Sequence, residues 1–432
     1  MKTNASVEAL CPIEIKGGGT LAGGMRAGDW MFASGHLAYA EQGKLDGRVV
    51  DERHPRRDRP RHEKEADVVF GRMQTVLDAA GMEWADVVRF DQFYTTWRAV
   101  PHYHVARHRA FGGRGAIPAS TSILIDGLLL PGAAIEASMV AYSPPAGMPI
   151  QALRPDGLEV APVMGFAPTV RVGDYVFLSG QMAENANDGI APEVKVPPTH
   201  LWKGLAIKLE TEHTVKKRLE PALSAGGSSL ANVVKAQAYI SDIDDIPAFN
   251  QVWNACFPTG APALTIVPTA RPGFNCPDAH VEINVMAVAD GGGVKKQVVS
   301  APGVHMPFEN QTQAVRAGDL LLISGLMAVD EDGVIPAALR DPSCPYFGGG
   351  IRAEMETILD MAQMLCEVAG TSLENVLRIQ QFHTNLDDFD AARRVWSEVL
   401  GDRPLPLSAV RVPSPLAVPG CSVQVDLWVY VP

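Results

Sequence analysis

Cysteine and histidine side chains are the first candidates for chemistry, because both ligate metals and a cysteine thiolate is a nucleophile. No two cysteines form a C-x-x-C motif, and no histidine lies beside a cysteine at zinc-finger spacing. His102, His104 and His108 are spaced i, i+2 and i+6, so one helical face cannot hold all three. We therefore expect free thiols in a reducing cytoplasm and no metal site. The cysteines are Cys11, Cys256, Cys276, Cys344, Cys366 and Cys421.

A basic segment at residues 52–64, with the sequence ERHPRRDRPRHEK, could bind an anionic substrate or a nucleic acid. Acidic residues are interleaved with its arginines, which favours a solvated and partly paired loop: Glu52, Asp58 and Glu63. The whole chain has 37 basic and 49 acidic residues and a net charge of −12. Nucleic-acid-binding proteins usually carry a basic surface with interleaved aromatic side chains, which this composition does not provide. We expect no nucleic-acid partner.

Length and composition indicate a folded protein of about three domains, since a domain typically has about 150 residues. Hydrophobic residues make up 47% of the 432 residues and charged residues 20%, which excludes disorder as the dominant state. The sequence has no run of about 18 apolar residues that could span a membrane. Residues 1–16 lack the basic and then apolar layout of a signal peptide. The sequence thus predicts a cytoplasmic protein that makes no membrane contact.

Three segments of the chain are almost alike. They read GDWMFASG at residues 28–35, GDYVFLSG at 173–180 and GDLLLISG at 318–325, so successive copies begin 145 residues apart. A second marker, the prolines at 118, 262 and 406, repeats every 144 residues, which is also one third of the chain. Two independent markers with one period indicate a domain of about 140 residues that occurs three times. A period this long excludes a solenoid, whose repeats have about 20–50 residues.

Each unit is expected to contain two helices. Apolar residues at helical spacing predict the first helix, and a glycine just after it fits a C-terminal cap. The apolar stripe is Val69, Met73, Val76 and Leu77 in unit 1, and Met355, Ile358, Leu359, Ala362 and Leu365 in unit 3. The second helix is shorter and carries Trp253 in unit 2 and Trp396 in unit 3.

The strands complete the predicted unit. The Gly-Asp turn and the apolar run behind it indicate one strand, and other apolar runs indicate the rest. The expected order is β-β-α-β-α-β-β, an α+β domain with helices on one face of a mainly antiparallel sheet. Further strands are expected at residues 87–94, 121–125 and 135–141, at 233–240 and 281–288, and at 376–383 and 423–430.

Breaks between the units are predicted from linker composition. Residues 143–147 (SPPAG) form a proline- and glycine-rich break, and residues 291–293 are three consecutive glycines. Neither these glycines nor those at 17–19 are followed by the lysine of a phosphate-binding loop. The predicted domains are residues 1–145, 146–292 and 293–432.

The ordered set of motifs resembles the reactive-intermediate deaminase family (RidA, also described as YjgF-like or L-PSP endoribonuclease-like), in three tandem copies. The resemblance covers nearly the whole chain and is clearest in unit 2. Its motifs there are SGQ (179–181), AG (225–226), NVV (232–234), YISD (239–242), Asn250, PA (262–263) and VEI (281–283).

The resemblance implies a chorismate-mutase-like fold and a trimer with a cleft at each subunit interface. Three units in one chain then imply a single-chain pseudotrimer, which would be a monomer or a dimer of pseudotrimers. Family members hydrolyse small reactive enamines and imines with release of ammonia, or act on intermediates of ring degradation. No metal or organic cofactor is implied.

The family's arginine, which grips a substrate carboxylate just after the Pro-Ala motif, is missing from this chain. The matching positions are Ser120, Leu264 and Ser408, and the positions two residues further on are Ser122, Ile266 and Val410. Strand alternation would point the nearby Arg411 to the opposite face. The resemblance therefore predicts that a simple imino acid held by its carboxylate, such as 2-aminoacrylate, is a poor substrate.

The family's cleft glutamate maps to the last strand of each unit, at Glu136, Glu282 and Gln424. A carboxyl group can activate water and protonate a leaving amine, whereas the amide of glutamine cannot. The alternative is a buried glutamate that is satisfied by backbone N–H groups. Because unit 2 keeps the most family features, Glu282 is expected to be the principal acid–base group and Glu136 the second.

Other lining positions also follow from the resemblance. The second-helix asparagine maps to His104, Asn250 and Arg393, and the aromatic residue before the Gly-Asp strand maps to Leu21, Phe166 and Gln311. The Ser-Gly segments are expected to offer backbone N–H groups to the ligand, whereas in the alternative reading their glycines only avoid a clash. These segments are Ser34 with Gly35, Ser179 with Gly180 and Ser324 with Gly325.

Two function classes remain open at this point. The first is an enamine or imine deaminase, or a related hydrolase acting on a ring-opened N-heterocycle, with water activated by a cleft glutamate. The second is a non-catalytic small-molecule-binding or scaffold protein that retains the fold, which the loss of all three arginines supports. The orientation of the two glutamates, into open clefts or into buried pairs, distinguishes the two.

Overall fold

The computed structural model describes residues 6–15, 19–40, 43–50, 53, 57–112, 117–158, 164–185, 189–197, 199, 204–335 and 350–432. Cys344 and part of the basic segment at 52–64 lie outside these residues, so their predictions stay untested there. The other five cysteines are free thiols. Among the helices described, none is both long and apolar enough to cross a membrane.

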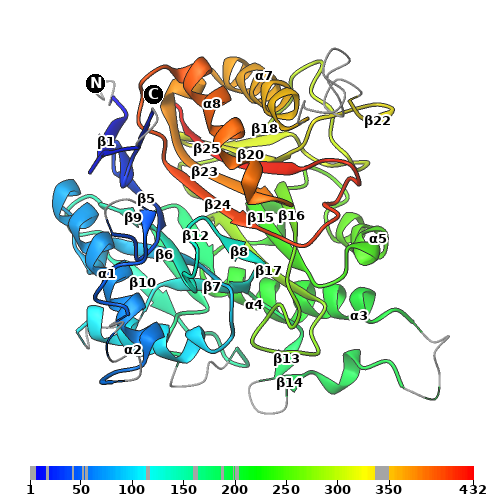
Figure 1. The fold of residues 1–432 in the computed structure, drawn as a ribbon. Coiled ribbons are helices and arrows are strands. Elements are labelled where there is room, and N and C mark those ends of the chain that lie inside the picture. Colours follow the sequence, from blue (N-terminus) through cyan, green and yellow to red (C-terminus); the bar gives the residue numbers. More distant parts are fainter. Residues whose placement is uncertain are drawn as a thin grey trace.

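Three large sheets with one common strand order form the framework (Figure 1). The first has the order β1-β4-β5-β9-β6-β7, the second β10-β11-β12-β17-β15-β16 and the third β18-β19-β20-β25-β23-β24 with β8 added at its edge. Their residues come from successive thirds of the chain, except for β8 of the first third. The breaks between the sheets lie between Tyr142 and Ile150 and between Val288 and Lys296, on either side of the predicted domain limits.

The strand bounds are as follows. The first sheet contains β1 (Glu8–Leu10), β4 (Gly24–Ala27), β5 (Trp30–His36), β6 (Val87–Tyr94), β7 (Ala119–Leu124) and β9 (Ile135–Tyr142). The second contains β10 (Ile150–Leu153), β11 (Thr169–Val172), β12 (Tyr175–Leu178), β15 (Val233–Ile240), β16 (Ala263–Pro268) and β17 (Val281–Val288). The third contains β18 (Lys296–Val299), β19 (Ala314–Ala317), β20 (Leu320–Leu326), β23 (Val376–His383), β24 (Leu407–Arg411) and β25 (Val423–Tyr430).

Short elements connect these strands. The short strands are β2 (Ile13–Glu14), β3 (Thr20–Leu21), β8 (Gly127–Leu128), β13 (Glu184–Asn185), β14 (Gly189–Ile190), β21 (Val329–Asp330) and β22 (Gly333–Val334). The 3-10 turns are η2 (Trp84–Asp86), η3 (Pro192–Val194), η5 (Leu230–Asn232), η6 (Ile243–Asp245), η7 (Leu373–Asn375) and η8 (Leu386–Asp388).

The mainly antiparallel sheet expected from the sequence is present, with one parallel pair in each sheet: β6 with β7, β15 with β16 and β23 with β24. The expected element order missed one strand at the start of each unit. The missing strands β1, β10 and β18 each pair antiparallel at the edge of a sheet. They are short and half-exposed, so their sequences lack the apolar run that marks a central strand.

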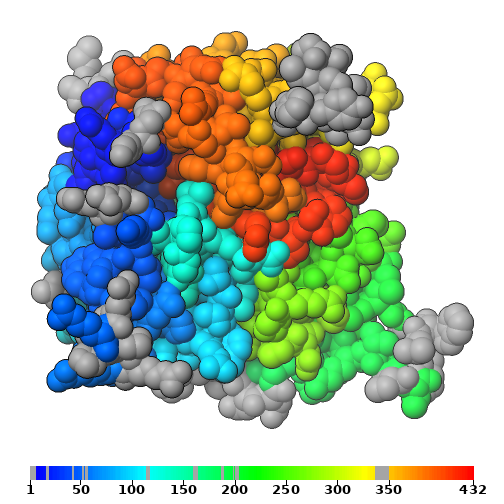
Figure 2. Space-filling model, viewed as in Figure 1, coloured from blue at the N-terminus to red at the C-terminus, as the bar shows by residue number. Residues whose placement is uncertain are grey.

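Helices cover the outer face of each sheet, and the three sheets face one another in the interior (Figure 1). The helices are α1 (Arg61–Ala80) and α2 (Ala99–Ala110) on the first sheet, α3 (Ala206–His213), α4 (Glu220–Ala225) and α5 (Ile246–Cys256) on the second, and α7 (Ile351–Ala369) and α8 (Phe389–Leu400) on the third. In Figure 2 the three thirds of the chain, blue to cyan, green, and yellow to red, occupy separate sectors of the visible face.

In units 1 and 3 the first helix ends at the predicted glycine. In unit 2 the first helix is interrupted. Gly81 and Gly370 cap α1 and α7 with positive φ values of 66° and 78°, which glycine adopts without strain. In unit 2 a π-helical segment, η4 (Thr214–Leu219), lies between α3 and α4. Pro221 follows at the start of α4, and a proline there cannot donate the usual helical hydrogen bond.

A buried glutamate on each first helix holds the start of the closing strand. Glu65 accepts hydrogen bonds from the backbone N–H groups of Ala134 and Ile135, at 2.6 and 3.0 Å. Glu210 accepts one from His280 at 2.7 Å, and Glu354 accepts one from Ser422 at 2.8 Å. These three glutamates are therefore structural, because they satisfy backbone donors that would otherwise be buried without partners.

Aromatic and charged side chains join the three sheets at their common centre. The ring of Phe93 lies 6.5 Å from that of Tyr239 and 6.1 Å from that of Phe382, and all three occupy equivalent strand positions. Beside them Asp91 pairs with both Arg89 and Arg378, at 2.7 and 2.6 Å. Lys235 pairs with Asp426 at 2.6 Å. The charges are buried, so removal of any one of them would leave its partner uncompensated.

Candidate functional site

The sheets contact one another at three interfaces of similar construction. At the first interface β7 packs against β12, at the second β16 packs against β20, and at the third β24 packs against β5. One wall of each interface is the strand after the Pro-Ala or Pro-Leu motif, together with the second helix of that unit. The other wall is the Ser-Gly strand and the closing strand of a neighbouring unit. Each candidate site is thus shared by two units.

The first interface contains a cavity of about 40 Å³ that brings together six of the predicted site residues. They are His104, Ser120 and Ser122 from unit 1, and Phe166, Gly180 and Glu282 from unit 2. Five further residues line the same cavity: Val100, Met164, Met182, Glu184 and Asn275. The wall opposite Glu282 is therefore that of unit 1, and Asn250 of unit 2 does not line this cavity.

Glu282 lies directly over Gly180, because a β-carbon at Gly180 would overlap the Glu282 Oε1 atom. Its side chain is only 5% exposed, and the described residues give its carboxyl group no hydrogen bond. Burial raises the pKa of Glu282 well above its usual value, and the nearby Glu184 carboxylate raises it further. This environment favours the protonated form of the carboxyl group, which can donate a proton.

The unit 1 wall opposite Glu282 consists of polar side chains that are hydrogen-bonded to one another. The hydroxyl groups of Ser120 and Ser122 both donate to Gln92 Oε1, at 3.0 and 2.8 Å. Arg107 donates from Nη1 to the Ser120 hydroxyl oxygen at 2.8 Å. Burial and the neighbouring Arg107 lower the pKa of His104 to about 3. His104 is therefore neutral at pH 7 and can either donate or accept a hydrogen bond.

The Ser-Gly backbone at this interface does not match the expected anion-binding role. The N–H group of Ser179 donates to Pro168 at 3.0 Å, and the N–H group of Gly180 donates to Ser120 at 3.1 Å. The Ser179 hydroxyl also donates to Ala167 and accepts from the Ser120 N–H, at 2.7 and 2.9 Å. Both backbone donors are thus already used to join the two units, and no N–H group remains there for a ligand.

The serines of the other two Ser-Gly segments are also used for structure. Ser324 donates to Thr312 at 2.6 Å and accepts from the N–H group of Leu264 at 2.8 Å, which joins units 2 and 3. Ser34 donates to Ala22 at 2.7 Å. The glycine in each segment is required because the side chain of the closing strand packs against it. This clash avoidance was the alternative explanation for the motif.

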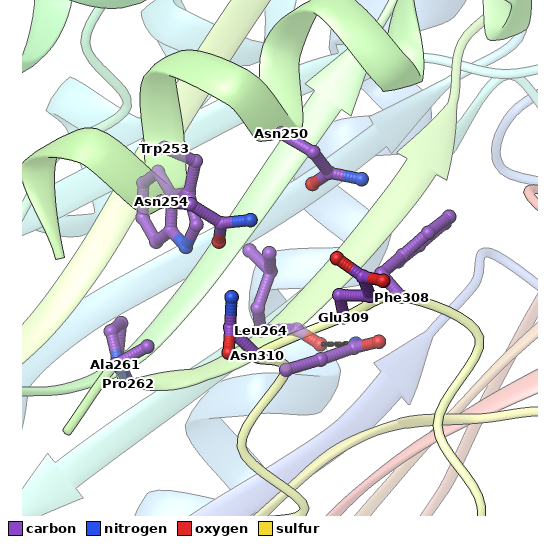
Figure 3. A pocket seen from close by; sticks show the side chains of 10 residues that line it. Asn250, Trp253, Asn254, Ala261, Pro262, Leu264, Phe308, Glu309 and Asn310 are labelled. Carbon is purple, nitrogen blue, oxygen red and sulfur yellow. Dashed lines mark hydrogen bonds between the residues drawn. The ribbon is translucent and has the colours of Figure 1, made fainter. Parts of the chain in front are cut away.

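The second interface has only a small cavity, seen from close by in Figure 3. Its closing strand carries Gln424 in place of an acid. Asn250, Leu264 and Gln311 line a cavity of about 10 Å³ there, and Gln311 donates to the Leu264 carbonyl at 3.2 Å. Gln424 is 2% exposed, and a β-carbon at Gly325 would lie 2.6 Å from its Nε2 atom. An amide in place of a carboxyl group cannot exchange protons, so this interface has no general acid at that position.

The third interface holds the second predicted catalytic residue in a closed pair. Glu136 is 1% exposed and packs against Gly35, and the Ser408 hydroxyl donates a hydrogen bond to Oε1 of its carboxyl group. Burial raises the pKa of Glu136 to about 8. Arg393, the second-helix residue of unit 3, is paired with Asp390 at 2.9 Å. The carboxyl group is thus satisfied within the protein.

Two residues at the predicted aromatic position lie where neighbouring units join. Leu21 forms a parallel bridge with Leu405 at the third interface, and Phe166, which also lines the first cavity, forms one with Ile117. Arg411 is exposed and donates to the Asp126 carbonyl at 2.9 Å, as expected for a side chain on the opposite face. In the described part of the chain no group of three or more His, Cys, Asp or Glu side chains could hold a metal ion.

Sequence reasoning missed several residues of the first interface. Glu184 follows the Ser-Gly-Gln segment, at the start of the short strand β13, and Arg107 lies one helical turn after His104, on the same face of α2. The i+3 spacing from a predicted lining residue was a usable signal for Arg107. No sequence signal marked Glu184, Met164 or Asn275 as lining residues.

The family model described as "Endoribonuclease L-PSP" matches residues 157–289 and 301–431, which together make up more than half of the chain. The first third of the chain lies outside this match, although its sheet has the same strand order as the other two.

Individual relatives each match about a third of the chain or less. The 3-aminoacrylate deaminase RutC of Acinetobacter baylyi is 29% identical over 140 residues, 32% of this chain and 98% of that protein. A 2-iminobutanoate/2-iminopropanoate deaminase of Dermatophagoides farinae is 28% identical over 133 residues, 31% of this chain and 92% of that protein.

A third relative is named for its location. Protein mmf2, mitochondrial, of Schizosaccharomyces pombe is 30% identical over 118 residues, 26% of this chain and 82% of that protein. Since the family model matches most of units 2 and 3, and the predicted motifs lie in the same stretches, this chain belongs to the endoribonuclease L-PSP family, the RidA-like family that those motifs resemble.

Proposed function

We propose that the protein is a deaminase that hydrolyses a small enamine or imine at the first interface, with Glu282 as its acid–base group. The observation that supports this most directly is a buried carboxyl group with a raised pKa on the wall of a cavity, without a hydrogen-bond partner among the described residues. The names of two relatives, which act on 3-aminoacrylate and on 2-iminobutanoate or 2-iminopropanoate, support the same class of substrate.

In the proposed reaction Glu282 takes part in four proton transfers. Its neutral carboxyl group protonates the imine nitrogen, and an enamine is first protonated at carbon to give the same iminium ion. Water then adds to the carbon and returns a proton to the Glu282 carboxylate, which forms a carbinolamine. Glu282 next protonates the amino group and accepts the hydroxyl proton, so that ammonia leaves and a carbonyl group forms. An imine and water are consumed, and a carbonyl compound and ammonia are produced.

The opposite wall would orient the substrate. Ser120 and Ser122 present hydroxyl groups that are held by Gln92, and His104 presents a neutral imidazole. Such fixed side chains cost little reorganisation when a substrate binds. Because the Ser179 and Gly180 N–H groups are occupied, polar groups of the substrate would be held by side chains and not by the Ser-Gly backbone.

We also propose that the three units form a single-chain pseudotrimer with limits near residues 145 and 292. The common strand order, the contact of Phe93, Tyr239 and Phe382, and the ion pairs across units support this arrangement. The 46.3 kDa chain should then sediment as a monomer, or as a dimer of pseudotrimers. An obligate trimer of chains in sedimentation equilibrium would contradict the proposal. Cytoplasmic location and the absence of a nucleic-acid partner stay predictions.

The activity can be tested with substrates that are generated in the assay. 2-Iminobutanoate and 3-aminoacrylate are produced in situ, and ammonia release is measured with and without the protein. Acceleration of either hydrolysis well above the spontaneous rate is expected. If neither is accelerated but a small ligand raises the melting temperature, the protein is the binding or scaffold protein of the alternative hypothesis. The second and third interfaces are closed, which favours a non-catalytic role for these two of the three sites.

A further inference from the structure

The outer surface of unit 2 carries an open groove of about 410 Å³. It lies between the first helix of the unit, which runs through α3, η4 and α4, and the second helix, α5. It shares no lining residue with the cavities of the first and second interfaces. Leu230, Val252, Ala255 and Cys256 line the groove together with Gln251 and four charged residues of the first helix: Lys208, Glu212, Lys216 and Glu220.

The four charged residues form a stripe of alternating sign along the first helix. They are spaced four residues apart and read Lys, Glu, Lys, Glu. An α-helix has about 3.6 residues per turn, so side chains four residues apart drift around its axis. The π-helical segment η4 lies in the middle of the stripe, and its wider turns reduce this drift. All four side chains therefore face the same groove.

The charges of this stripe remain accessible. Glu212 and Lys216 are each about half-exposed and pair with each other along the helix, at 2.5 Å. Such a pair on the surface contributes little to stability, so its members can take other partners at low cost. Lys208 donates to the neutral side chain of Gln251, and Glu220 is exposed without an ion pair to any described residue.

Units 1 and 3 close the corresponding groove with an ion pair between their two helices. In unit 1 Arg109 of α2 pairs with Asp67 of α1 at 2.6 Å, and in unit 3 Glu398 of α8 pairs with Arg352 of α7. The equivalent residue in unit 2 is Ala255, since each of the three lies five positions after the second-helix site residue of its unit. Alanine cannot form an ion pair, so in unit 2 the groove stays open beside an uncovered stripe of charges.

The order of these charges fits a second copy of the same stripe. If two copies pack antiparallel about a two-fold axis between Glu212 and Lys216, Lys208 meets Glu220 of the partner subunit. Glu212 then meets Lys216 of the partner subunit, so every contact joins opposite charges. A parallel arrangement would place each charge against its own copy. An interface of this self-complementary kind is what a two-fold dimer requires.

We propose that two chains form a two-fold dimer through this groove, with the first helix of unit 2 of one chain seated in the groove of the other. Leu230, Val252 and Ala255 supply apolar surface to be buried, and the alternating charges fix the antiparallel register. This inference goes beyond the proposed activity and selects the dimer of pseudotrimers over the monomer. A monomer would refute only the dimer, whereas an obligate trimer of chains would refute the pseudotrimer.

Sedimentation equilibrium of the full-length protein is the first test. At micromolar concentration and low salt the mass should be twice the 46.3 kDa of one chain. The dissociation constant should rise with ionic strength, because salt screens charge pairs at a surface. A protein that stays monomeric at low salt would overturn the proposal and leave the groove to a different partner.

Exchange of the charges tests the two-fold arrangement. K208E/K216E makes the stripe wholly acidic and E212K/E220K makes it wholly basic, so each variant alone should dimerise at least about 100-fold more weakly. An equimolar mixture of the two should recover the dimer. D360K/E367K adds the same net charge as E212K/E220K on α7 and should stay dimeric. Melting temperatures show that the variants are folded. A mixture of folded variants that stays monomeric would contradict the arrangement.

A single substitution tests the groove without removing any charge of the stripe. A255R gives unit 2 the arginine that unit 1 has as Arg109, which can pair with Glu212 within the chain and occupy the groove. A255R should therefore weaken the dimer at least about tenfold, whereas A255S, which keeps a small side chain, should dimerise as the wild type does. A folded A255R protein that dimerises as tightly as the wild type would show that the dimer uses another surface.

Discussion

The first and third interfaces begin from the same sequence features and end as different sites. Each has a glutamate on a closing strand, a glycine beneath it and a serine opposite it. At the third interface the Ser408 hydroxyl donates to Glu136, and the pair is closed. At the first interface the equivalent Ser120 donates to Gln92 instead, and Glu282 faces a cavity.

The cause of this difference lies one strand away from the serines. Gln92 and Gln381 are equivalent, but Gln381 Oε1 is hydrogen-bonded to His383 at 2.9 Å. The Ser408 hydroxyl therefore donates to Glu136 and not to Gln381. Gln92 Oε1 accepts from Ser120, and Arg107 donates to the same hydroxyl group. Equivalent glutamates can therefore differ in their hydrogen bonding, because the neighbouring wall decides where a single hydroxyl group points.

The largest expected effect is a difference in turnover between variants of the two glutamates, Glu282 and Glu136. E282Q keeps the shape of the side chain but removes proton exchange, so the rate of ammonia release should fall by about 10²–10⁴-fold. E136Q is the matched control and should keep the activity of the wild type. Both are measured by steady-state ammonia release, with melting temperatures recorded in parallel. Loss of activity in E136Q alone would show that the third interface is the working site.

The second effect concerns stability as a function of pH at the third interface. Folding raises the pKa of Glu136 from its usual 4.5 to about 8. The folded protein therefore prefers the protonated form, and this stability is complete below about pH 4.5 and is lost as the pH rises through about 8.

E136Q cannot lose a proton and so avoids this loss. Its free energy of unfolding relative to the wild type should rise between pH 5 and pH 9 by at most about 4 kcal/mol, at about 1.4 kcal/mol for each unit of pKa shift. Denaturant unfolding at the two pH values measures the change. The difference between variant and wild type cancels the contributions of other titrating groups. A pH-independent difference would mean that Glu136 is not a neutral buried acid.

The third effect tests the close packing of glycine under the closing strand. In G180A the new methyl group overlaps Glu282 Oε1, so the carboxyl group must move and turnover should fall by about 10–100-fold. In G325A the methyl group meets Gln424 and Thr265, at 2.6 and 2.9 Å, and should cost about 1–3 kcal/mol of stability without loss of turnover. Equal loss of activity in both would contradict the first interface as the single working site.

The smallest effect tests how the site residues are grouped. Asn250 belongs to the same unit as Glu282 but lines the second interface, between α5 and residues 308–311. N250A should therefore change turnover by less than about twofold, because distant sites usually act independently. H104A, at the equivalent position of the first interface, is the comparison variant and should lower turnover. The rate of ammonia release is measured for both variants. A large loss of activity in N250A would show that Asn250 and Glu282, which belong to one unit, also belong to one site.

Much of the fold could be predicted from the sequence. The strands at 233–240, 281–288, 376–383 and 423–430 have the predicted bounds, because buried strands of this length are continuous apolar runs between turn residues. The glycine caps of α1 and α7 were also predictable. The edge strands β1, β10 and β18 were not, since an exposed edge leaves a weak apolar signal. The interruption of the unit 2 helix by η4 was also missed.

The sequence by itself determined the repeat, the strand that carries each glutamate and the family to which its motifs belong. Only the tertiary structure decided which residues share a site. Glu282 meets Ser120, Ser122 and His104 of the preceding unit, and Asn250 of its own unit lies elsewhere. Local patterns record how a segment alternates between core and solvent, whereas a shared site depends on how whole sheets pack. The direction of the Ser120 hydroxyl and the buried charge of Arg107 arise only from that packing.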